Sequence, residues 1–150
     1  MTNYREKLWP APWLYIATAL VMPASLLVLL PINAFAGLVT AVVLYAGCVI
    51  LLITGSPVIR VTDSHLLAGK ARLPLRVIGE VTAYEGEDAK LQTGQLLDAR
   101  AWLLIRGWIA PIVRVQVTDE TDPTPYWVVS SRHPQAVVAA IEAAREAATR

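Results

Sequence analysis

Charge is missing from most of the first third of this 150-residue chain. Between Lys7 and Arg60 there is no Asp, Glu, Lys, Arg or His, and crossing a hydrocarbon core of about 30 Å takes roughly 20 apolar helical residues. The uncharged stretch is therefore long enough for two crossings. Pro31 and Asn33 interrupt it near the middle and predict a turn, because proline removes a backbone donor. The predicted transmembrane helices are residues 13–30 and 34–54.

Basic residues flank the apolar stretch on both sides, whereas its predicted turn carries no charge. Arg5 and Lys7 precede the first predicted helix, and four basic residues follow the second. The positive-inside rule therefore predicts a multi-pass protein of the cell (inner or plasma) membrane with both termini in the cytoplasm. Its aromatic residues lead us to interpret "REKLWPAPW", residues 5–13, as an interfacial anchor. The basic residues after the second helix are Arg60, Lys70, Arg72 and Arg76.

A signal peptide is the alternative interpretation of the N-terminus. Ala34-Phe35-Ala36 has the A-x-A form of a signal-peptidase site and follows a basic start and an apolar run. The apolar run is longer than that of a signal peptide, and Pro31 with Asn33 explains the interruption without cleavage. We therefore favour the helical hairpin.

Cysteine and histidine are too scarce to build a disulfide framework or a thiolate metal site. Cys48 is the only cysteine and falls inside the second predicted helix. His65 and His133 have no Cys, Asp or Glu at metal-ligand spacing. The sequence also lacks a glycine-rich phosphate loop and a G-x-S-x-G motif. We therefore expect no catalytic residues, no metal and no cofactor, and predict that the protein is not an enzyme.

From residue 57 onward, apolar and polar residues alternate between turn signals, which predicts about seven short strands in an antiparallel sheet that folds on itself. The acidic stretch "EGED" reads as a loop. "HPQAVVAAIEAAREAATR", residues 133–150, predicts one amphipathic C-terminal helix. The predicted domains are an anchor with two transmembrane helices, residues 1–56, and a cytoplasmic β domain, residues 57–150. The predicted strands are "VIRVTD", "HLLAGK", "ARLPL", "VIGEVTAYE", "RAWLLIRG", "IVRVQVTD" and "PYWVVSS".

Two sets of motifs carry a resemblance to known families. "VIRVTDSHLLAGKARLPLRVIGEV" resembles the opening of bacterial pleckstrin-homology-like domains. The whole chain, from "NYREKLWPAPW" through "LDARAWLLIRGW" to "DPTPYWVVSSRHP", resembles an uncharacterised family of two-span bacterial membrane proteins. The resemblance implies an α+β membrane protein in which a transmembrane hairpin precedes a pleckstrin-homology-like split barrel with a C-terminal helix. It implies no established activity and no catalytic residues.

The predicted β domain is electrically balanced, since eleven basic and eleven acidic residues follow residue 57. A neutral domain without a basic stripe is a poor binder of nucleic acid, and its long-range attraction to anionic lipid is modest. We therefore expect no nucleic-acid partner.

Arginine and tryptophan alternate in "RAWLLIRGW", residues 100–108, and would share one face of a strand. The stretch "DETDPTPYW" is expected to set the register of the last strand; the alternative is that its aromatic pair forms one wall of a groove with the residues of that face. Lipid headgroups, a protein partner or the C-terminal helix could each cover such a face, because Arg and aromatic residues suit all three surroundings. We predict a membrane-tethered module that binds a protein partner, with anionic phospholipid as the alternative ligand. The predicted binding residues are Arg100, Trp102, Arg106, Trp108, Tyr126 and Trp127.

Overall fold

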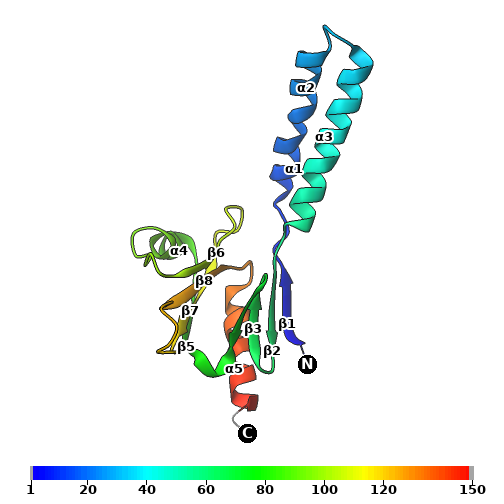
Figure 1. Cartoon of the computed structure of the whole chain (residues 1–150). Coiled ribbons are helices and arrows are strands. Elements are labelled where there is room, and N and C mark those ends of the chain that lie inside the picture. The colour runs from blue at the N-terminus through cyan, green and yellow to red at the C-terminus, as the bar shows by residue number, and fades with distance from the viewer. Residues whose placement is uncertain (1, 149–150) are drawn as a thin grey trace. The chain divides into compact units, whose positions relative to one another are not determined.

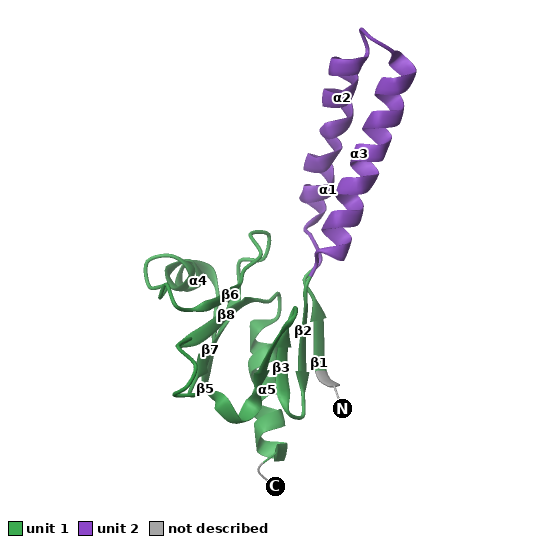
Figure 2. Cartoon of the chain, viewed as in Figure 1, with its two compact units in different colours: residues 1–8, 57–150 green, residues 9–56 purple. Residues whose placement is uncertain are grey.

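A computed structural model describes residues 2–148 and divides the chain into two compact units (Figures 1 and 2). One unit, residues 9–56, is helical. The other is an α+β unit that combines residues 1–8 with residues 57–150. The helical unit is therefore an insertion between two strands of the α+β unit. The predicted division after residue 56 differs from this arrangement, because it separates the N-terminal strand from the sheet that it completes.

The helical unit contains α1 (Pro12–Ala19), α2 (Val21–Leu29) and α3 (Ala34–Thr54). Two segments, Pro12–Leu29 and α3, are long and apolar enough to cross a membrane by length and composition. The turn between α2 and α3 falls where Pro31 and Asn33 predicted it. The Asn33 side chain begins α3, because its Oδ1 accepts hydrogen bonds from two backbone N–H groups of the first turn, at 2.9 and 3.1 Å.

Small residues allow α2 and α3 to approach closely. Gly37 and Ala41 are the buried residues of α3. A Cβ atom added to Gly37 would lie 3.3 Å from the Cβ of Leu29, which is tighter than ordinary van der Waals contact. The two apolar segments therefore pack closely within one chain at a glycine where an added Cβ would push against Leu29.

Sheet A consists of four antiparallel strands in the order β1-β2-β3-β4 (Figure 1). The sequence analysis did not predict β1: residues 5–7, assigned to an interfacial anchor, pair with β2 instead. The β3–β4 turn places Gly69 at φ +61°, a backbone conformation that favours glycine. The strands are β1 (Thr2–Lys7), β2 (Val58–Thr62), β3 (His65–Ala68) and β4 (Ala71–Pro74).

Sheet B has the strand order β5-β7-β8-β6. Its β6 pairs parallel to β8, so the prediction of a wholly antiparallel domain is wrong. Residues 105–111 carry the chain past the end of β8 to β7, and two hydrogen bonds hold this crossing: Arg106 N–H to Ser130 Oγ and Ser131 N–H to the Pro111 carbonyl. Alternation of polar and apolar residues indicates a strand, but it does not indicate whether that strand pairs parallel or antiparallel with its neighbour. The strands are β5 (Ile78–Tyr84), β6 (Trp102–Leu104), β7 (Ile112–Val117) and β8 (Tyr126–Ser130).

Three helical segments complete the α+β unit: the short 3-10 helix η1 (Leu75–Val77), α4 (Gly86–Thr93) and α5 (Pro134–Ala148). The predicted C-terminal helix is confirmed as α5. The stretch "EGED", predicted as a loop, instead leads into α4, and Ala89 of that helix is buried.

The main core lies between the inner faces of the two sheets and the apolar side of α5. Sheet A contributes Ile59, Val61 and Leu66, which are at most 1% exposed, and α5 contributes Val137 and Ile141. A second, smaller core lies on the other face of sheet B. Its buried members are Ala89, Ile112, Tyr126 and Val128.

Candidate functional site

The structure separates the six predicted binding residues. Trp102 and Trp127 belong to the main core, where their ring centroids are 4.2 Å apart at 34°. Trp127 is only 6% exposed. Since β6 ends at Leu104, residues 100–108 do not form the continuous strand that would align their side chains. Trp127 is therefore a core residue, and Trp102 packs against the same core while staying partly exposed.

Tyr126 lies on the opposite face of β8 and is 5% exposed. Its hydroxyl oxygen accepts a hydrogen bond from the backbone N–H of Asp98 at 2.7 Å, which fastens the loop between α4 and β6 to the sheet. The guanidinium of Arg114 lies over the ring, with Cζ 4.0 Å from the centroid. Tyr126 therefore positions a loop and an arginine.

Arg100 lies in that loop and binds Asp98 through two side-chain hydrogen bonds, at 3.0 and 3.3 Å. These bonds hold the pKa of the exposed Asp98 carboxyl below its ordinary value. Arg106 and Trp108 are in the crossing after β6, where the Arg106 guanidinium carbon lies 5.9 Å from the Trp108 ring centroid. Trp108 is half-buried against the main core. The structure thus joins these residues as local pairs and not as one site.

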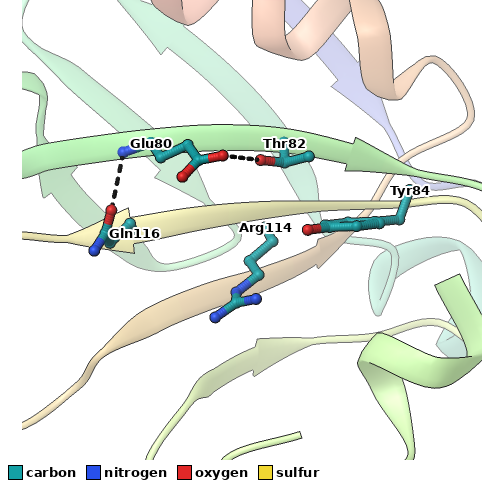
Figure 3. A pocket seen from close by; sticks show the side chains of 5 residues that line it. All are labelled: Glu80, Thr82, Tyr84, Arg114 and Gln116. Carbon is teal, nitrogen blue, oxygen red and sulfur yellow. Dashed lines mark hydrogen bonds between the residues drawn. The ribbon is translucent and has the colours of Figure 1, made fainter. Parts of the chain in front are cut away.

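A polar pocket of about 120 Å³ lies on the outer face of sheet B (Figure 3). Alternate residues of two neighbouring strands line it, because β5 and β7 pair antiparallel and direct every second side chain to this face. Their inward neighbours, such as Val113 and Val115, belong to the main core. The lining residues are Glu80, Thr82, Tyr84, Arg114 and Gln116.

Hydrogen bonds arrange the polar groups around this pocket. Thr82 donates from its hydroxyl to Glu80 Oε1 at 3.2 Å, and the backbone N–H of Glu80 donates to Gln116 Oε1 at 3.3 Å. Arg114 donates to Gln92 Oε1 of α4 at 3.2 Å. The pocket therefore offers one cation and one carboxylate on a sheet whose side chains are held in place. It suits recognition of one polar side chain or another small polar group.

The sequence analysis missed this pocket although its signal was present. "IGEVTAY" and "IVRVQV" each alternate polar with apolar residues, but only the pairing of β5 with β7 brings the polar ones together. Within residues 2–148 there is no group of three or more His, Cys, Asp or Glu side chains placed to hold a metal ion.

Comparison with known proteins places the chain in a family. No curated protein and no solved structure matches it significantly. Residues 3–141 match the family described as "Protein of unknown function (DUF3093)", which covers both units. The chain therefore belongs to this DUF3093 family.

Proposed function

We propose that the protein is a two-span integral membrane protein whose α+β unit is a cytoplasmic interaction module that performs no chemistry. The exposed apolar side chains of the helical unit support the membrane assignment. Leu27, Ile32 and Phe35 are 79%, 78% and 76% exposed, which is unfavourable in water and favourable in a bilayer. No residue of Pro12–Leu29 is fully buried, and in α3 only Gly37 and Ala41 are, unlike in the core helices of a soluble protein.

Strand pairing supports a topology with both ends of the hairpin on one side of the membrane. The strands that precede and follow the helices are neighbours in sheet A, and Leu8 N–H donates to the Pro57 carbonyl at 2.9 Å. Two strands of one sheet cannot lie on opposite sides of a bilayer. The basic residues near both ends then favour the cytoplasm.

The same strand argues against removal of a signal peptide. Cleavage after Ala36 would remove β1 and also Leu8, which is fully buried in the main core. It would further remove Glu6, whose Oε1 accepts the backbone N–H of Arg132 at 2.8 Å. The strand formed by residues 2–7 in the α+β unit therefore supports retention of the N-terminal segment.

Two packed sheets and a C-terminal helix also support a fold similar to the pleckstrin-homology-like split barrel. The parallel pair of β6 and β8 is a departure from that fold. We propose the pocket on sheet B as the contact for a protein partner, because its charged and polar groups are already oriented by hydrogen bonds.

Two experiments test this function. Topology is tested by labelling in a Cys48→Ser background, with a single cysteine introduced at Asn33 in the turn or at Ser64 in the α+β unit. In intact cells a membrane-impermeant maleimide is expected to label position 33 and to spare position 64. Labelling of both positions, or of position 64 alone, would contradict the proposed topology.

Partner binding is tested by photo-crosslinking in native membranes. A photo-reactive amino acid replaces Gln116, which lines the pocket, or Ala143, an exposed residue of α5. We expect a specific adduct from position 116 that disappears when Thr82→Trp fills the pocket. An adduct that persists with Thr82→Trp, or that forms equally from position 143, would contradict a role for the pocket.

A further inference from the structure

The outer face of sheet A carries a row of arginine residues. Arg5 of β1 is the direct cross-strand partner of Arg60 in β2, Arg60 is paired with Leu67 in β3, and Leu67 is paired with Arg72 in β4. All three arginines are exposed. The intervening residues of the same strands, Ile59 and Leu66 among them, point into the main core. We name this surface the basic face: Arg5, Arg60 and Arg72.

No partner within the described chain neutralises the basic face. The structure gives these three side chains neither a hydrogen bond nor an ion pair within residues 2–148. Like charges placed directly opposite each other on neighbouring strands destabilise a sheet. Arg5 and Arg60 therefore reduce the stability of sheet A, which is the pattern expected of side chains that serve a ligand.

The basic face corrects the expectation of a domain without a basic stripe. That expectation counted charges from residue 57 and left Arg5 outside the domain. Most acidic side chains lie outside sheet A, in residues 80–98, in residues 119–122 between β7 and β8, and in α5, whereas Asp63 lies in the turn between β2 and β3 and Glu6 lies in β1. A net charge near zero therefore does not exclude a local basic surface.

Covalent connections keep the basic face near the proposed membrane surface. Residues 9–11 join sheet A to α1, and residues 55–56 join α3 to the residue before β2. Six residues separate Thr54, the last residue of α3, from Arg60, which is at most about 20 Å of extended chain at a rise of roughly 3.3 Å per residue. Headgroups extend several ångströms beyond the hydrocarbon core. Chain length alone therefore limits the distance between Arg60 and the lipid phosphates to about two Debye lengths at most.

We propose that the basic face binds the phosphate groups of anionic phospholipids in the leaflet that the α+β unit faces. This proposal rests on the proposed membrane topology. Guanidinium groups suit phosphate because their planar donors form paired hydrogen bonds with its oxygens. Each basic residue at an anionic surface strengthens binding roughly fivefold at low ionic strength. Three arginines together therefore strengthen it about a hundredfold.

The test uses the full-length protein in nanodiscs that contain equal parts of phosphatidylglycerol and phosphatidylcholine. Native mass spectrometry measures the ratio of the two lipids that remain bound to the protein. The test variant combines Arg5→Gln, Arg60→Gln and Arg72→Gln. The control variant removes three other exposed basic side chains, by Arg76→Gln, Lys90→Gln and Arg100→Gln.

We expect the unchanged protein and the control variant to retain phosphatidylglycerol preferentially. The test variant should lose that preference by up to a hundredfold and unfold at a higher temperature, since like-charge repulsion is relieved. An unchanged lipid ratio in the test variant would overturn the proposal, as would an equal loss in the control. Loss of a bound nucleic acid or acidic protein at an unchanged lipid ratio would also overturn it in favour of that polyanion. Extraction of the unchanged protein from membranes by alkaline carbonate would instead refute the membrane topology.

Discussion

Deleting residues 1–56, which the sequence marks as a separable anchor, is expected to unfold the rest of the chain. The truncated protein loses β1, the edge strand of sheet A, and Leu8, which is fully buried. It also loses Glu6, whose carboxylate binds the Ser131 hydroxyl and the Arg132 N–H at the start of α5. The result therefore distinguishes between two models: one folding unit built from two stretches of the chain, and two domains that follow each other in the sequence.

The size of the effect follows from these contacts. Burial of a leucine side chain contributes about 1.5–3 kcal/mol, and each hydrogen bond to a charged group about 1.5–3 kcal/mol. Leu8 and the two bonds of Glu6 alone therefore contribute roughly 5 kcal/mol or more, before strand pairing is counted. Domains of this size are stable by only about 5–15 kcal/mol. Removal of β1 thus takes away a large share of the total.

The comparison needs a second protein in which only the helices are removed. Leu8 is joined to Pro57 through a short Gly/Asn linker, which the 2.9 Å hydrogen bond between these residues permits. We expect cooperative urea unfolding of the linked protein, followed by circular dichroism, and little or no cooperative transition for residues 57–150. Equal unfolding midpoints for the two proteins would refute the role of β1.

Three further predictions concern single side chains. Burial and the Glu6 carboxylate raise the pKa of Tyr4 from 10.0 to about 12. The neutral form of Tyr4 therefore contributes stability below pH 10, and this contribution is lost as the pH rises toward 12. In the Tyr4→Phe variant, the urea-unfolding midpoint should depend less on pH across that range. Trp102→Ala should lower the free energy of unfolding by about 3 kcal/mol or more, as a core substitution does; an unchanged midpoint would restore Trp102 as a surface residue. Gly37→Leu should lower the thermal stability of the detergent-solubilised protein, because even a Cβ there lies 3.3 Å from Leu29, whereas Gly47→Leu, where a Cβ meets nothing within 4 Å, should not.

The two long apolar segments and their turn could be predicted because absence of charge over so many residues leaves few alternatives. Asn33 marked the turn for a physical reason, since its side chain accepts the N–H groups that the first turn of α3 leaves unpaired. The C-terminal helix was equally predictable from its apolar stripe. Each of these features depends on residues that are close in sequence.

The strand β1 and the candidate sites depend instead on residues that are far apart. In "TNYREK" polar residues occupy both faces of the strand, so the sequence shows no clear alternation. The inner residues Tyr4 and Glu6 contact the core and α5, and the strand that pairs with this one follows some fifty residues later. The Arg/Trp face of residues 100–108 was wrong as a continuous strand because β6 ends at Leu104. Alternate residues share one face only within a strand, so the alternation says nothing about side chains beyond the end of β6.

If the proposed topology holds, the position of the helices between β1 and β2 couples the folding of sheet A to membrane insertion. During synthesis β1 is made first, yet β2 becomes available only after both apolar segments have been made. Under the proposed topology, insertion of only one segment would leave the two strands on opposite sides of the bilayer, and insertion of both brings them together on one side. Leu8 cannot enter the main core before that pairing forms, and the Glu6 contacts that fasten β1 to the start of α5 must also wait. The basic face is completed by the same event, because Arg5 reaches Arg60 only through β1. A protein in which only one segment has inserted therefore lacks its edge strand, part of its core and its complete basic face, so partial insertion leaves the α+β unit incompletely folded.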